Sequence, residues 1–196
     1  MRTGSKGEEV PGISTTPGEP ATAGTVIIPA IMADTLFRGY RAVVVPEWID
    51  INDHMNARFY ASVIYDAHVL FTDHIGLGEA YVAARHCGKV VVESHLVYER
   101  ELRLGDEIGV TSRLLAVDDK RMHFAHELMN LRQGYRAALA EQLDLHVDLG
   151  SRRAAPLPAD IHQRLVALVR SQASMPLPAK LGRALHLPVT SRCAPR

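Results

Sequence analysis

The sequence predicts an α+β fold in which one long, largely buried helix packs on a single curved antiparallel sheet. Two observations predict it. Apolar side chains recur at helical spacing between residues 56 and 76, and four stretches of alternating apolar residues follow between residues 90 and 147. A recurrence every three or four residues is typical of one helix face, whereas alternation is typical of a half-buried strand. The strand stretches are joined by short turns, which favours antiparallel pairing.

The 196 residues divide into one folding unit and two tails. Residues 1–39 are rich in Gly, Pro and Thr and hold few large apolar side chains. Burial cannot offset the entropy of ordering such a segment, so we expect a disordered tail. The folding unit is expected at residues 40–172. Residues 173–196 are rich in proline and are expected to pack loosely.

Composition excludes several classes of function. Lys+Arg and Asp+Glu both number 22, and no basic stripe is visible, so we expect no nucleic-acid partner. No apolar run approaches the ~20 residues needed to span a membrane, so we expect no membrane partner. Two cysteines, Cys87 and Cys193, are too few for a disulfide framework or a Cys-rich zinc site. A reducing, cytoplasmic compartment is the simplest interpretation.

The first predicted elements are a strand and the long helix. The apolar stretch Ala42–Val45 predicts a short strand that Pro46 ends. Asn56 is the predicted N-cap of a helix that ends near Gly76. The apolar stripe of this helix consists of Tyr60, Ile64, Ala67, Phe71 and Ile75. Neighbouring apolar residues widen the stripe, so most of the helix is expected to be buried.

Four strands are predicted after the helix, over residues 90–101, 108–116, 122–128 and 137–147. Turn residues separate them at Gly105, Asp118 and Gly134. We therefore expect a meander in which each strand lies beside the next one in sequence. In the last strand the odd-numbered apolar residues, such as Leu143 and Leu145, are expected to share one face. A short amphipathic helix is predicted at residues 160–170.

The loop between the first strand and the long helix concentrates polar groups. Asp50, Asn52, Asp53, His54 and Asn56 fall within seven positions, directly before the helix start. Free backbone N–H groups and the helix dipole at such a place can hold an anion or a developing oxyanion. A carboxylate, an imidazole and amides there could serve hydrolysis. The alternative is that Asp50 and Asn56 are only turn and cap residues.

No metal site or cofactor is expected. Of the ten histidines, His123 and His126 lie three apart on a predicted strand, which places them on opposite faces. No His-x-x-x-His or Glu-x-x-His pair falls on a predicted helix, and most histidines are expected to be solvated or hydrogen-bonded. The sequence also lacks a Gly-x-Ser-x-Gly elbow and a phosphate-binding loop.

The run from Ile49 to Asn56, with Tyr60 four residues on, resembles the Ile-Asp-x-Asn-Gly-His-Met-Asn-x-x-x-Tyr start of hotdog-fold acyl-CoA thioesterases. These enzymes form the 4-hydroxybenzoyl-CoA thioesterase-like superfamily. The sequence is most similar to the betainyl-CoA thioesterase branch, and the resemblance covers about residues 41–158. Further matching patterns are Glu93-x-His95-x-x-Tyr98, Leu104-Gly105-Asp106, Asp119-Lys120-Arg121-x-His123 and His146-Val147-Asp148.

The resemblance implies a central helix wrapped by an antiparallel sheet, paired as a homodimer or homotetramer with active sites at the subunit interface. It implies that Asp50 acts as base or nucleophile, and that a backbone amide near residues 54–56 holds the oxyanion. Asn52, His54 and Asn56 would orient the loop, a water or the thioester oxygen. At the position of the glycine in the family motif, this sequence has Asp53. Asp tolerates a positive φ better than most residues do.

The branch implies hydrolysis of a short polar acyl-CoA, with betainyl-CoA favoured, in carnitine and betaine metabolism. A trimethylammonium group is bound by aromatic faces. The candidates are Trp48, Tyr60, Tyr65 and Tyr98, with Glu93 as counter-charge, although Tyr60 and Tyr98 could belong to the core instead. The alternatives are a thioesterase for medium-chain or aromatic acyl-CoA or acyl-carrier protein, and a non-catalytic acyl-CoA-binding protein.

Overall fold

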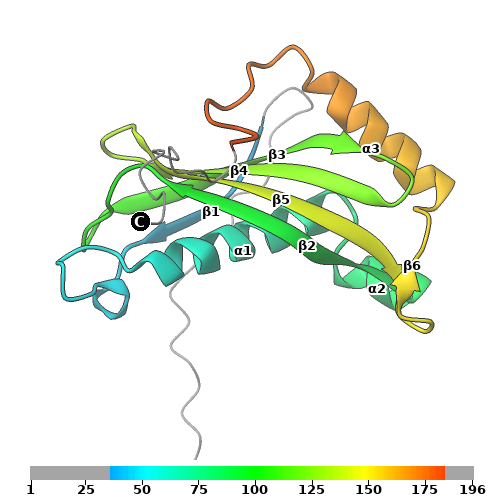
Figure 1. The fold of residues 1–196 in the computed structure, drawn as a ribbon, viewed down its shortest axis with the longest axis horizontal. Helices are drawn as coiled ribbons and strands as arrows, with labels where there is room; N and C mark the ends of the chain where they lie inside the picture. Colours follow the sequence, from blue (N-terminus) through cyan, green and yellow to red (C-terminus); the bar gives the residue numbers. More distant parts are fainter. Residues whose placement is uncertain (1–35, 184–196) are drawn as a thin grey trace, which may run out of the picture.

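The computed structural model describes residues 36–183. The predicted tail at residues 1–39 therefore lies almost wholly outside the described residues, as does the end of the proline-rich segment. In the described part, a curled antiparallel sheet wraps around helix α1 (Figure 1). The elements in chain order are β1 (Phe37–Val43), η1 (Pro46–Trp48), α1 (Ala57–His74), α2 (Glu79–Arg85), β2 (Cys87–Tyr98), β3 (Glu107–Val117), β4 (Arg121–Asn130), β5 (Arg136–Asp148), β6 (Arg153–Ala154) and α3 (Ala159–Ser171).

Helix α1 has the start, end and buried face that the sequence predicts. The Asn56 side chain caps it by accepting a hydrogen bond from the Arg58 amide, and Gly76, at a φ of 83°, follows its end. Four residues of the predicted apolar stripe are buried within the helix, and the fifth is buried at its C-cap: Tyr60, Ile64, Ala67, Phe71 and Ile75. The central helix wrapped by an antiparallel sheet, which the resemblance implies for one chain, is confirmed.

The first strand begins earlier than predicted. Strand β1 runs from Phe37 to Val43 and pairs with β3 at an edge of the sheet, so Arg38 and Arg41 point to solvent. These exposed arginines interrupt the apolar pattern, which is why the sequence suggested only the end of the strand. The predicted helix at residues 160–170 is confirmed as α3, which packs against β3.

The predicted meander is wrong for its first strand. The sheet order is β1-β3-β4-β5-β2, so β2 lies beside β5 at the far edge and not beside β3. Residues 99–106 carry the chain from the edge strand β2 across to β3, which lies between β1 and β4, and Gly105 belongs to this crossover and not to a hairpin. The helix α2 was also not predicted. Strand pairing depends on contacts between distant residues, which local turn signals do not specify.

The odd-numbered apolar residues of β5 share one face, but in the second half of the strand the other face is the more deeply buried one. Gln142, Asp144 and His146 are buried there, while Leu143 and Leu145 are only partly buried. The polar side chains face inward because they find buried partners. His146, for example, receives a hydrogen bond from the Tyr81 hydroxyl at Nε2 (2.8 Å) and donates from Nδ1 to the Ala155 carbonyl (2.8 Å).

After α3 the chain returns along the sheet. The buried Arg113 of β3 donates hydrogen bonds to the carbonyls of Gln172 and Pro176, and Arg136 of β5 donates to the carbonyl of Ala179. Residues 172–182 are thus fixed to the sheet by two arginines. Between residues 36 and 183, no helix is long and apolar enough to cross a membrane.

Candidate active site

The polar loop before α1 is a closed turn. Ile49 and Met55 form an isolated antiparallel bridge, and within it the Asp50 amide donates to the His54 carbonyl at 3.1 Å. Asp53 turns the chain at a φ of 58°, in the left-handed region where glycine is favoured. The Asp that replaces the family glycine therefore does adopt positive φ, as its sequence position suggested.

The Asp50 carboxylate is oriented from two sides. Its Oδ1 accepts a hydrogen bond from the Asn52 amide at 2.8 Å, and its Oδ2 accepts one from Asn56 Nδ2 at 3.3 Å. His54 Nδ1 lies 3.9 Å from Oδ1. Asn56 therefore acts twice, because its Oδ1 also caps α1 through the Arg58 amide at 3.1 Å. The turn and cap roles foreseen as an alternative thus coexist with a carboxylate held at the helix start.

A pocket of about 380 Å³ opens beside this carboxylate. It brings together five of the nine residues singled out in the sequence. Its lining residues are Asp50, His54, Met55, Asn56, Ala57, Tyr60, Tyr98, Glu99, Arg100 and Glu101. Residues 99–101 follow β2, so the pocket lies between the start of α1 and the end of β2.

The backbone amides at the helix start are not equally free. The Met55 amide donates to the Leu102 carbonyl at 2.7 Å, and the Asn56 amide donates to the Trp48 carbonyl at 2.8 Å. Two amides of the expected 54–56 region are thus already committed. Ala57 is the first helical residue and lines the pocket, and amides of a first turn have no partner within the helix. The Ala57 amide is therefore the candidate donor to a bound oxyanion.

The two pocket tyrosines differ in role. The Tyr60 hydroxyl donates to the Arg100 carbonyl at 3.3 Å and accepts from the Leu102 amide at 3.0 Å, and burial raises its pKa. Tyr98 is half exposed, and its ring meets Tyr60 edge-on with 5.3 Å between centroids. Tyr60 thus supports the wall of the pocket, whereas Tyr98 offers a free aromatic face to a ligand.

Four of the predicted residues do not line this pocket. Trp48 stacks on Phe59 with 5.6 Å between ring centroids and packs against the core, and Asn52 is exposed on the loop. Tyr65 is exposed on α1 outside the pocket lining. Glu93 lines a different cavity. Within one protomer, the four aromatic side chains therefore do not form one cage.

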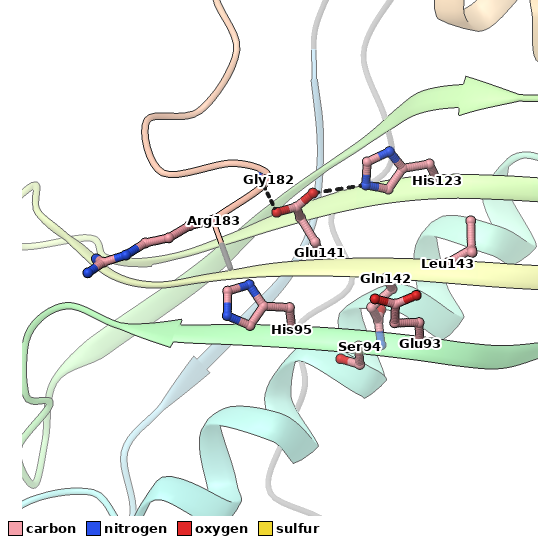
Figure 2. A pocket seen from close by; sticks show the side chains of 9 residues that line it. All are labelled: Glu93, Ser94, His95, His123, Glu141, Gln142, Leu143, Gly182 and Arg183. Atoms are coloured by element: carbon pink, nitrogen blue, oxygen red, sulfur yellow. Dashed lines mark hydrogen bonds and ion pairs between the residues drawn. The ribbon is translucent and has the colours of Figure 1, made fainter. Parts of the chain in front are cut away.

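The cavity at Glu93 has a volume of about 590 Å³. Figure 2 shows Glu93, His95, His123 and Glu141 on the side of the sheet away from α1, beneath the C-terminal segment. Glu141 is hydrogen-bonded to His123 at 3.0 Å and to the Gly182 amide. His126 is fully buried on the opposite face, as the spacing of His123 and His126 predicts. Among residues 36–183, no group of three or more His, Cys, Asp or Glu side chains could hold a metal ion.

A chain of buried polar side chains links α1 to the sheet. Ser112 Oγ lies 2.8 Å from His126 Nδ1, His126 Nε2 lies 3.1 Å from His68 Nδ1, and His68 Nε2 lies 2.9 Å from Asp144 Oδ2. Each donor meets an acceptor if the protons point from Ser112 towards Asp144. Lys89 Nζ lies 3.0 Å from His68 Nε2 and 3.4 Å from the same carboxylate oxygen; because Nε2 then carries a proton, Lys89 pairs with Asp144 and not with His68.

The electrostatics of this chain follow from its burial. Desolvation by burial, with the nearby positive charge of Lys89, holds the pKa of His126 well below its ordinary value, so His126 is neutral. Burial also lowers the pKa of Lys89, and Asp144 opposes that shift. This hydrogen-bonded chain was not predicted from the sequence. Its only local signal was the polar series Gln142, Asp144 and His146 alternating with leucines in β5.

Comparison with known proteins identifies the family. The family described as the thioesterase-like superfamily matches residues 44–165, which include the polar loop, α1 and the pocket. A betainyl-CoA thioesterase from Pseudomonas aeruginosa is 35% identical over 149 residues, covering 76% of this chain and 94% of that protein. The chain belongs to the thioesterase-like superfamily.

As a member of the thioesterase-like superfamily, the protein is a thioester hydrolase. An L-carnitine dehydrogenase/betainyl-CoA thioesterase from Agrobacterium fabrum is also 35% identical, covering 82% of this chain but 33% of that longer protein. A Staphylococcus aureus protein solved in complex with CoA superposes with a TM-score of 0.73 at 26% identity, covering 82% of this chain and all of that one. A putative thioesterase from Pseudomonas putida superposes at 0.67 with 31% identity, covering 79% and 98%.

Proposed function

We propose that this protein hydrolyses a short polar acyl-CoA thioester and that betainyl-CoA is its substrate, giving betaine and CoA in carnitine and betaine metabolism. The observation that carries the proposal is the Asp50 carboxylate, held by Asn56, in one pocket with Ala57, the first residue of α1. Support for the acyl group comes from the relatives from P. aeruginosa and A. fabrum, whose names include betainyl-CoA thioesterase. The S. aureus structure supports CoA as the thiol.

The reaction needs a base or nucleophile and a site for negative charge. Asp50 either takes a proton from water as the water attacks the thioester carbon, or attacks that carbon itself to form an anhydride that water then hydrolyses. In both routes the carbonyl oxygen becomes an oxyanion, and the Ala57 amide at the positive end of α1 stabilises it. The carbon–sulfur bond then breaks, and the CoA thiolate leaves and takes up a proton. One such donor typically lowers the barrier by about 3 kcal/mol.

The acyl group is proposed to lie against Tyr98. A quaternary ammonium on an aromatic face gains roughly 0.5–2 kcal/mol, and Tyr98 is the half-exposed aromatic of the pocket. The pocket rim is also rich in carboxylates, with Asp50, Glu99 and Glu101. A cationic acyl group suits this rim better than a long alkyl chain does, which favours betainyl-CoA over the medium-chain alternative.

We propose that two copies of the chain pair to complete the site. Strand β2 is an edge strand that pairs only with β5 over the described residues, and Val90, Val91 and Val92 on it are exposed. An exposed apolar edge strand is an unfavourable surface unless something covers it. Its end is followed directly by residues 99–101, which line the pocket. A partner at β2 would therefore border the site, in a homodimer or a homotetramer.

The test is release of free CoA thiol from betainyl-, acetyl-, 4-hydroxybenzoyl-, hexanoyl- and palmitoyl-CoA. The expected result is a preference for betainyl-CoA. A preference for 4-hydroxybenzoyl- or hexanoyl-CoA would keep the hydrolase and replace the substrate. No turnover of any thioester, with CoA still bound, would favour the non-catalytic alternative.

The role of Asp50 is tested by Asp50→Asn. We expect kcat to fall at least ~100-fold, the scale of a general base, while the fold is retained. Asp53→Asn is the matched control, because it makes the same carboxylate-to-amide change in the same loop and Asn tolerates positive φ. Asp53 is absent from the pocket lining, so the control should keep its activity. Unchanged turnover in Asp50→Asn would remove Asp50 from the mechanism.

A further inference from the structure

The segment after α3, residues 172–182, is here called the C-terminal strap. Its first anchor is Arg113, whose side chain is 6% exposed. Arg113 Nη1 donates to the Pro176 carbonyl at 2.9 Å, and Nη2 donates to the Gln172 carbonyl at 3.0 Å. A buried cation is costly unless polar groups surround it. The carbonyls of the strap supply such groups, so the strap is an integral part of this fold.

The second anchor is an ion network around Arg136. Its guanidinium binds Glu99 through two hydrogen bonds of 2.9 and 3.0 Å, and its Nη2 also donates to the Ala179 carbonyl at 2.8 Å. Glu127 binds its Nη1 at 2.6 Å, and Lys180 Nζ lies 3.0 Å from Glu99 Oε1. The Arg136 and Glu99 side chains are mostly buried. Forked, partly desolvated contacts of this kind are stronger than exposed ion pairs.

Glu99 is also the first residue of the wall segment, residues 99–102, that borders the candidate active site. The backbone carbonyl of the next residue, Arg100, accepts a hydrogen bond from the Tyr60 hydroxyl, and the carbonyl of Leu102 accepts one from the Met55 amide. Met55 belongs to the loop that carries Asp50. The wall segment is thus bonded to the Asp50 loop and α1 on one side, and through Glu99 to the strap on the other.

We propose that the C-terminal strap positions the wall of the substrate pocket through Lys180, Arg136 and Glu99. The strap supplies Lys180 and the Ala179 carbonyl, Arg136 joins them to Glu99, and Glu99 fixes the wall segment. Arg136 is a positioning residue, because it does not line the pocket, whereas Glu99 both holds the wall segment and contributes a carboxylate to the pocket rim. The kinetic part of this inference rests on the proposed function.

The test uses the full-length protein with Lys180→Met, which removes a half-exposed side chain and is expected to fold. We expect a KM for the best thioester of the panel that is about 5–10-fold higher, with kcat changed less than about 3-fold, since loss of uniform binding raises KM alone. Amide hydrogen exchange in residues 99–102 should become at least about 10-fold faster. Glu99→Gln should also speed amide exchange in residues 99–102, and combining it with Lys180→Met should add little to the exchange rate because the two variants remove one contact.

Arg132→Ala is the matched control. Arg132 pairs with Glu107 at 2.8 Å near the same end of the sheet, both side chains are exposed, and neither binds the strap. It should alter neither KM nor exchange at residues 99–102. Unchanged exchange in Lys180→Met overturns the proposal, as does faster exchange with an unchanged KM. If the wild-type protein hydrolyses no thioester, the proposed function is refuted instead. Amide hydrogen exchange at residues 99–102 in Lys180→Met then decides by itself whether the strap holds the wall segment.

Discussion

His68 Nε2 lies 2.9 Å from Asp144 Oδ2, and both side chains are fully buried. This contact joins α1 to β5 and continues through His126 to β3 and through Lys89 to β2. A helix packed on a sheet by apolar contacts alone can slide, whereas a hydrogen-bonded chain is satisfied in one arrangement only. The Asp50 site is built at the start of the same helix, so the placement of α1 also places the site.

Asp144→Asn should destabilise the protein by about 3–5 kcal/mol. The variant leaves Lys89 as a mostly buried cation without its counter-charge, and breaking one side of a buried pair has this scale of cost. Urea unfolding measures the loss. Lys89→Met combined with Asp144→Asn should lose less than Asp144→Asn alone. The control is Asp160→Asn, which removes the exposed Arg85–Asp160 pair and should cost less than about 1 kcal/mol. Equal losses in the two Asp→Asn variants would contradict the burial argument.

The two roles of Asn56, capping α1 and orienting Asp50, can be separated by mutation. Asn56→Ala removes both the cap and the hydrogen bond to Asp50, so it should lose about 1 kcal/mol of stability and also activity. Asn56→Ser keeps a good cap but loses the Nδ2 donor without adding a charge, so its stability should be retained while kcat falls about tenfold, the value of a hydrogen bond to a charged group. Urea unfolding and thiol release are the two measurements. Full activity in Asn56→Ser would show that Asp50 does not need this donor.

Glu99 should make stability depend on pH in the acid range. Its hydrogen bonds to Arg136 and Lys180 lower its pKa from the ordinary 4.5 to about 2. Because the folded-state pKa is depressed, Glu99 stabilises the protein fully above the unfolded value and loses that contribution as pH falls towards about 2. Urea unfolding of the wild type and Glu99→Gln should differ at neutral pH and converge across this window. A pH-independent difference would mean that the carboxylate charge contributes nothing.

The pairing of two chains is testable at β2. Val92→Lys places a charge on the exposed edge strand and should convert a dimer into monomers in light-scattering measurements, with loss of thiol release. Val43→Lys is the matched control, since Val43 is similarly exposed on β1 at the opposite edge of the sheet. Dissociation by Val43→Lys alone would move the interface to β1. A monomeric wild type would refute the pairing.

The sequence by itself determined α1 and the polar loop before it. The apolar stripe, the Asn56 cap and the Asp53 turn depend on neighbours within a few residues, so local physics specifies them. The same short range explains why Asp50, His54, Asn56 and Tyr60 could be grouped in advance. All four lie within eleven positions of one loop and the first helical turns.

Only the tertiary structure decided where β2 lies and which side chains it and β5 bury. The crossover after β2 moves Tyr98 and residues 99–101 beside Asp50, while strand alternation places Glu93 on the other face, away from the pocket it was expected to serve. The inward polar residues of β5 and the strap contacts of Arg113 and Arg136 likewise join positions far apart in sequence. Such contacts are specified by the energy of the whole packed arrangement, in which a buried charge is stable only once its distant partner is in place.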